Sequence, residues 1–178
     1  MIIARIIDNV LNGGFAFYKR NSSMLWDVSD PAIVCTTEYA LGLSVAMTSD
    51  AQHVVASTST GSVLFQQNQA KTSYVALQAL VLDVPIPNIV ARGLIPSVAI
   101  QPTSANRRIV VGYPDSVGVA FVFDYNGSSF VQVPGYLSTL LNNGDFFGLS
   151  VAVSDNDKFV IGAFGVDTFT GESHFQPD

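Results

Sequence analysis

Few residues in this sequence could perform chemistry, and the clearest candidates are two acids in one polar turn. Asp155 and Asp157 lie within residues 154–158, next to Lys158 and without a glycine. A calcium site takes about six to eight oxygen ligands, usually from several carboxylates, and a glycine where its loop turns sharply. The sequence therefore favours a polar hairpin turn here and predicts no cofactor. Calcium bound at Asp155 and Asp157 is the alternative.

The histidines and the cysteine do not form a recognisable catalytic or zinc motif. The chain has two histidines, His53 and His174, and one cysteine, Cys35. A structural zinc site needs about four cysteine or histidine ligands, and nucleophilic catalysis needs a serine or cysteine beside a histidine. We therefore predict no catalytic residues and a protein that is not an enzyme. The single cysteine also excludes an internal disulfide framework.

A repeat of short strands must position any functional residue in this chain. Ser-Val-Ala occurs at residues 44–46, 97–99 and 150–152, at intervals of 53 residues (97 minus 44 and 150 minus 97). A fixed period of tens of residues is typical of stacked or radial repeat arrays. The pattern divides the single domain 1–178 into units 1–38 (partial), 39–91, 92–144 and 145–178 (partial).

Overlaying these units predicts short strands in every one of them. We expect strands at 43–47, 53–56, 61–66 and 74–82, then at 96–100, 109–112, 118–123 and 130–133, and finally at 149–153, 159–163 and 171–175. Residues 4–7, 14–18 and 24–28 match the last three strands of a unit. The first unit therefore lacks its first strand, and the last unit lacks its fourth.

Glycine and asparagine mark the turns between the expected strands. A glycine precedes each expected third strand, where a positive φ would let the chain reverse; these are Gly14, Gly61, Gly118 and Gly171. An asparagine follows each of the first three of those strands, because asparagine tolerates the left-handed conformation; these are Asn21, Asn68 and Asn126. Asn21 and Asn126 also fit the glycosylation sequon, but the turn explains both residues without a glycan.

The last unit carries a family resemblance. Residues 147–152 (Phe-Gly-Leu-Ser-Val-Ala), then 162–164 (Gly-Ala-Phe) and Gly171, resemble the FG-GAP repeat of integrin-α-type β-propellers. Residues 41–46 are an altered copy, and 118–127 resemble the third strand and hairpin of that repeat. The other units depart from the motif: Leu94-Ile95 replaces Phe-Gly, while 56–58 (Ala-Ser-Thr) and 112–114 (Gly-Tyr-Pro) replace Gly-Ala-Pro.

This resemblance covers nearly the whole chain and implies a fold and a function. It implies an all-β protein whose β-propeller blades each have four antiparallel strands, with about three and a half blades in this chain. It also implies a non-enzymatic module for protein interaction or cell adhesion at an extracellular or particle surface. Some blades of this family bind calcium in the turn after the first strand, which corresponds here to 48–52, 102–107 and 154–158.

Composition narrows the classes of partner. The net charge of −6 disfavours nucleic acid and anionic membranes, which bind basic surfaces. The only basic pairs, Lys19-Arg20 and Arg107-Arg108, are interpreted as solvated turns. Residues 1–7 are too short for a signal peptide, and the longest apolar run, 74–84, is interrupted by polar residues and too short to span a bilayer.

The number of strands leaves the array incomplete. Propellers usually close with about four to eight blades of four strands, because an open array exposes strand edges and apolar faces. We therefore expect this chain to belong to a longer polypeptide or a larger assembly, with a protein partner or another copy completing the propeller. The segments 68–73 and 85–93 differ most between units and are the expected contact loops.

Two other functions remain open at this stage. A carbohydrate-binding propeller would use exposed aromatic residues such as Trp26 or Tyr18, although packing between blades is the favoured role for both. A structural role in a large surface or particle assembly is the second alternative.

Overall fold

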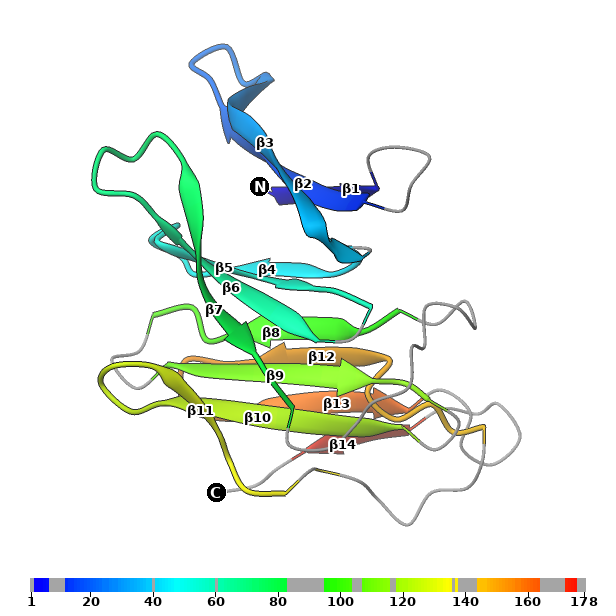
Figure 1. Ribbon diagram of the computed structural model, residues 1–178. Helices are drawn as coiled ribbons and strands as arrows, with labels where there is room; N and C mark the ends of the chain where they lie inside the picture. The colour runs from blue at the N-terminus through cyan, green and yellow to red at the C-terminus, as the bar shows by residue number, and fades with distance from the viewer. Residues whose placement is uncertain are drawn as a thin grey trace.

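The computed structural model describes residues 2–6, 12–39, 41–59, 61–82, 95–103, 107–115, 118–135, 137, 144–163 and 172–175. These residues form an all-β protein of 14 strands, and the described part of the chain contains no helix. The strands make four separate antiparallel sheets that follow one another in chain order (Figure 1). Each sheet is a meander in which sequential strands are neighbours, so every connection within a sheet is local.

The four sheets contain three, four, four and three strands. Sheet 1 consists of β1 (Ile2–Ile6), β2 (Asn12–Arg20) and β3 (Trp26–Tyr39). Sheet 2 consists of β4 (Val45–Met47), β5 (His53–Ser57), β6 (Ser62–Gln67) and β7 (Tyr74–Leu80). Sheet 3 consists of β8 (Ser97–Ile100), β9 (Arg108–Tyr113), β10 (Val119–Tyr125) and β11 (Phe130–Gln132). Sheet 4 consists of β12 (Ser150–Val153), β13 (Phe159–Ala163) and β14 (Glu172–Phe175).

Apolar side chains point to both faces of the two inner sheets, and this stacks the sheets face to face. On β5, Val54 and Ala56 pack toward sheet 1, whereas Val55 between them packs toward sheet 3. On β10, Phe121 packs toward sheet 2 and Val122 packs toward sheet 4. Each fully buried valine or phenylalanine side chain stabilises the fold by about 1.5–3 kcal/mol. The continuous apolar runs in the sequence are thus strands covered on both faces.

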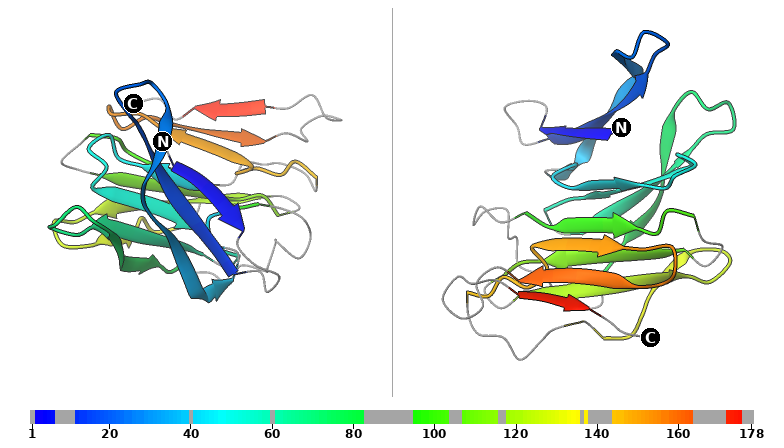
Figure 2. Two further views of the ribbon diagram at one scale, coloured as in Figure 1. Left: turned by 90° about the horizontal axis from the view of Figure 1, so that it is seen from above. Right: turned by 180° about the vertical axis from the view of Figure 1, so that it is seen from behind.

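The first strands of successive sheets lie closest together. β4 packs against β8, and β8 packs against β12, while the outer strands β7 and β11 touch much less (Figure 2). β1 packs against β4 as β5 packs against β8, so β1 takes the place of a second strand, and the described part of sheet 1 has three strands, as expected from the sequence. No sheet among the described residues closes on itself.

The serines of the repeated Ser-Val-Ala join consecutive sheets by hydrogen bonds. The Ser44 hydroxyl accepts from the Val98 backbone N–H at 3.1 Å, and the Ser97 hydroxyl donates to the Gly148 carbonyl at 2.8 Å. Each bond links residues about one repeat apart. The periodic serine is therefore explained by inter-sheet packing.

The Phe-Gly motif marks a close approach between two backbones. An added Cβ on Gly118 would lie 2.0 Å from the Phe147 carbonyl oxygen, and one on Gly13 would lie 1.8 Å from the Leu41 carbonyl oxygen. Gly118 and Phe147 also form a parallel bridge. Only glycine fits where the motif of one unit meets the start of the third strand of the unit before it.

This contact corrects the predicted alignment of the repeats by one residue. Gly13, and not Gly14, corresponds to Gly118, because Gly13 lies against the backbone of Leu41 as Gly118 lies against the backbone of Phe147. Neither Gly14 nor Gly61 has the expected positive φ, whereas Gly118 has a φ of 87°; Gly171 lies outside the described residues. A one-residue slip moves every side chain to the other face of a strand, and sequence similarity alone did not resolve it.

The same correction applies to the second strand. Ser97 lies opposite Gly112 and Ser150 lies opposite Gly162, but Val45 lies opposite Ala56. Ser57, and not Ala56, therefore takes the glycine position of sheet 2, and its hydroxyl accepts from the Ser44 N–H at 2.9 Å. The turn after β4 is shorter than the turn after β8, but it is one residue longer than the alignment of the repeats predicted.

The predicted strand at 24–28 is too short. β3 runs for 14 residues, and its pairing with β2 shifts register between Phe15 and Phe17 and again between Phe17 and Tyr18. The first of these irregularities spans Pro31, which lies between the paired residues Asp30 and Ile33 and has no N–H to donate to the ladder.

The three asparagines make the hairpin turns, but by a different mechanism from the expected one. The side-chain oxygens of Asn21, Asn68 and Asn126 each accept hydrogen bonds from two backbone N–H groups further along their turns. None of the three has a positive φ; Met24, Lys71 and Gly127 adopt that conformation instead. Asparagine acts here as a side-chain acceptor that closes the turn.

Candidate functional site

The acidic turn predicted as the alternative calcium site joins two sheets. Asp155 accepts hydrogen bonds from the N–H of Thr103 at 3.0 Å and from its hydroxyl at 2.5 Å. The Asp157 carboxylate accepts from the Gln101 side-chain amide at 2.9 Å, and Asp157 itself has a φ of 65°. Among the described residues, no group of three or more histidine, cysteine or acidic side chains is arranged to hold a metal ion. The absence of a cofactor at this turn stays a prediction, and calcium at Asp155 and Asp157 stays its alternative.

His53 lies at the start of β5 and faces an arginine from the next sheet. Arg107 Nη1 lies within hydrogen-bond distance of His53 Nδ1 and 3.2 Å from Nε2, and Arg107 Nη2 lies 3.6 Å from the Asp50 carboxylate. Arg107 and Arg108 are half-buried between sheets, so their interpretation as a solvated turn was wrong. Two adjacent charged residues usually lie in solvent, and the local sequence does not indicate that sheet 2 packs opposite them.

The surroundings lower the pKa values of both His53 and Asp50. Burial lowers the pKa of His53 below its ordinary value, and the positive charge of Arg107 lowers it further, while Asp50 opposes both. Burial by itself would raise the pKa of Asp50. Hydrogen bonds from Thr48 and Gln52 and the charge of Arg107 outweigh that effect and hold the pKa of Asp50 below its ordinary value. At neutral pH, His53 is uncharged and Arg107 faces an ionised Asp50.

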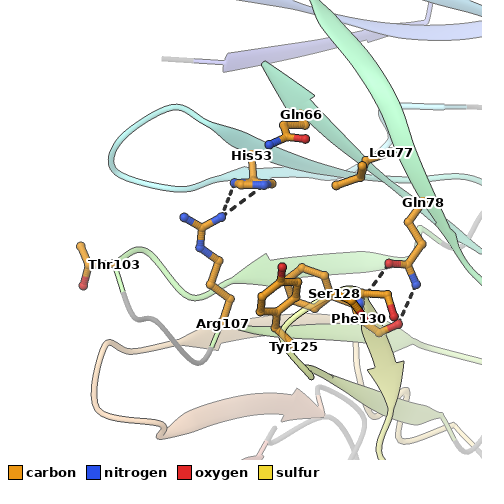
Figure 3. Close-up of a pocket in the computed structure, with 10 residues that line it drawn as sticks. His53, Gln66, Leu77, Gln78, Thr103, Arg107, Tyr125, Ser128 and Phe130 are labelled. Carbon is orange, nitrogen blue, oxygen red and sulfur yellow. Dashed lines mark hydrogen bonds between the residues drawn. The ribbon is translucent and has the colours of Figure 1, made fainter. Parts of the chain in front are cut away.

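A groove of about 550 Å³ opens beside this group, between sheets 2 and 3. Figure 3 shows its two walls: one comes from β5, β6 and β7, and the other from the start of β9 and the β10–β11 hairpin. Polar residues, two aromatic residues and one leucine line it together: His53, Gln66, Leu77, Gln78, Thr103, Arg107, Tyr125, Ser128, Ser129 and Phe130.

Gln78 joins the two walls of the groove. Its side-chain amide donates to the Phe130 carbonyl at 2.6 Å and accepts from the Phe130 N–H at 2.9 Å, so β7 is tied to β11. Beside it, the ring of Tyr125 packs against Phe130 with centroids 5.3 Å apart and remains 37% exposed to solvent. The walls therefore keep a fixed separation, with an aromatic surface between them.

A second, smaller groove of about 220 Å³ lies between sheets 3 and 4. Its centre is an ion pair in which Arg108 Nε and Nη2 donate to the two Asp124 oxygens at 2.7 and 3.1 Å. Arg108 also donates to the Asp157 carbonyl, 3.2 Å away. These contacts satisfy the charges internally and support the joint between the two sheets.

Repeat spacing was the one sequence signal that could have found these contacts. His53 and Arg107 are 54 residues apart, and Gln78 and Phe130 are 52 apart, close to the repeat interval. Gln78 has no role that its local sequence predicts. The side chains of His174 and Cys35 lie outside the described part of the chain.

The aromatic residues considered for sugar binding lie elsewhere. Trp26 is 50% exposed at the start of β3 and so does not pack between sheets as favoured, while Tyr18 is half-buried. Neither belongs to the groove. Of the expected contact loops, 68–73 forms the exposed β6–β7 hairpin, and 85–93 lies outside the described residues.

Neither the protein-family models nor the curated protein sequences contain a match to the chain. Among the described residues, no helix has the length and apolar character needed to span a bilayer.

Proposed function

We propose that the chain is a non-enzymatic protein-interaction or adhesion module of FG-GAP-like β-propeller repeats, belonging to a longer chain or a larger assembly. The observation that carries this proposal is the open outer face of sheet 4. Val160 is equivalent to Val55 and Val110 in the ladders, and these two are fully buried by the following sheet. Val160 is half-exposed, and both Ser150 and Ala152 on the neighbouring strand are exposed.

The inner sheets indicate what should cover that face. Ser44 and Ser97 each bond to the sheet that follows, and Ser150 occupies the same position in sheet 4. A partner that presents a further first strand would satisfy Ser150 and bury Ala152 and Val160. The hydrophobic effect, which favours removing apolar surface from water, would drive this contact as it drives the stacking of the described sheets.

Exposed apolar residues at a hairpin tip support contact with protein. Met24, Leu25 and Trp26 are consecutive and 50–65% exposed where β2 turns into β3. A contiguous apolar group on a rigidly held hairpin is typical of interaction surfaces. The absence of enzymatic activity is part of the proposal.

A photoreactive phenylalanine analogue at position 152 tests the proposal in the native context. We expect crosslinks from position 152 to a β-sheet segment, in the same polypeptide or in another, whose peptides are identified by mass spectrometry. The same analogue at Val131, an exposed residue of the outer strand β11, is the control and should give no defined product. A native polypeptide of about 19.0 kDa that stays monomeric and uncrosslinked would overturn the proposal.

A further inference from the structure

The groove between sheets 2 and 3 has the size of a small-ligand site. Its volume of about 550 Å³ falls within the range of about 300–1,000 Å³ that is typical of such sites. Two sheets and the two hydrogen bonds between Gln78 and the Phe130 backbone hold the groove, so its shape is largely formed before any ligand arrives. Preformed walls reduce the entropy lost on binding.

The charges around the groove cancel. Arg107 is the only cationic side chain of the lining at neutral pH, because burial and the arginine keep His53 uncharged. Asp50 lies 3.6 Å from Arg107 and balances its charge. A free anion would have to compete with Asp50, and a cation would meet Arg107. A neutral ligand fits best.

The polar groups that line the groove are planar amides, a guanidinium and hydroxyls. His53 and Gln66 are direct cross-strand partners on β5 and β6, and Arg107 faces His53 from the other sheet (Figure 3). Ser129 also lines the groove. Amides and hydroxyls both donate and accept hydrogen bonds, and the guanidinium donates them, so together these groups match the vicinal hydroxyls of a sugar, which also donate and accept. Tyr125 adds an exposed ring on which an apolar face can stack.

We propose that this groove binds a neutral saccharide unit, stacked on Tyr125 and hydrogen-bonded by Gln66, Arg107 and the β10–β11 hairpin. The site is independent of the sheet 4 face and of Trp26. It therefore adds glycan recognition to a protein-interaction module, at a place formed only where two consecutive sheets meet.

The test uses the full chain and defined sugars. Saturation-transfer NMR and calorimetry would be run with glucose, galactose, mannose and N-acetylglucosamine, and with glucuronate as a charged comparison. We expect saturable binding of at least one neutral sugar. Tyr125→Ala should weaken it about tenfold or more, and Tyr125→Phe should retain it. Gln66→Leu should also weaken it, because a buried sugar hydroxyl would lose its partner.

Matched variants locate the site and keep the test decisive. Trp26→Ala removes an exposed aromatic of sheet 1 and should leave the affinity unchanged. Ser129→Trp fills the groove from the hairpin and should abolish binding, which covers the case in which Tyr125→Ala does not fold. The proposal is overturned if folded protein binds none of the sugars, if glucuronate is preferred to every neutral sugar, or if Trp26→Ala abolishes binding while Tyr125→Ala does not.

Discussion

Replacing Gly118 by alanine should separate sheet 4 from sheet 3. Gly118 is buried with a φ of 87°, and an added Cβ would lie 2.0 Å from the Phe147 carbonyl oxygen and 2.4 Å from its nitrogen. Both neighbours are backbone atoms, so no side-chain rotation relieves the collision. One of the two sheets must move.

Gly127 provides a matched control for the backbone strain. It has a φ of 99°, and an added Cβ would have no atom within 4 Å. Alanine in the left-handed region costs about 1–2 kcal/mol at either position. Forcing extra volume into a packed contact adds about 1–3 kcal/mol at Gly118 alone. We therefore expect a loss of about 2–5 kcal/mol for Gly118→Ala and about 1–2 kcal/mol for Gly127→Ala.

Urea denaturation measures both losses as changes in the unfolding free energy. The unfolding free energy of a typical protein is about 5–15 kcal/mol. The larger loss should therefore clearly lower the urea concentration at the unfolding midpoint. Hydrogen exchange adds a spatial readout: protection should fall first in β12 and β13 for Gly118→Ala and stay near wild type in β5 and β6. Equal losses for the two variants, or lost protection centred on sheet 2, would refute the close-approach explanation of the Phe-Gly motif.

Three further substitutions test the joints between sheets. Ser97→Ala removes the hydroxyl that donates to Gly148 and should cost about 1 kcal/mol by urea denaturation, whereas Ser150→Ala on the open face should change stability little; equal costs would contradict the serine's role. Gln101→Leu removes a fully buried amide that donates to the β12–β13 turn, and thermal unfolding should show a loss of about 1–3 kcal/mol. Because the pKa of His53 is lowered from its ordinary 6.5, the unfolded chain binds a proton that the folded chain does not, and stability should fall as the pH drops below about 6.5. His53→Gln should flatten that part of a urea-midpoint profile between pH 7.5 and 5, and an unchanged profile would show that another group causes it.

The repeat interval and the strand positions were available from the sequence, because they depend on local properties. Turn residues and alternating or continuous apolar runs specify where strands begin and end, and nearly every expected strand appears within two or three residues of its predicted bounds. The three strands in the described part of sheet 1 also agree with the predicted number. Pro31 shows the limit: β3 continues past it because bulges absorb the lost donor, and that depends on the partner strand.

The tertiary structure alone decided which residues face each other between sheets. The sequence placed Gly14 where Gly13 belongs and Ala56 where Ser57 belongs, since a shift of one residue hardly alters local similarity but reverses the faces of a strand. The groove has the same origin: His53 and Arg107 lie one repeat apart, and only the stacking of sheet 2 on sheet 3 brings them into contact. Local sequence fixes short-range backbone geometry, whereas contacts across 50 or so residues depend on how whole sheets pack.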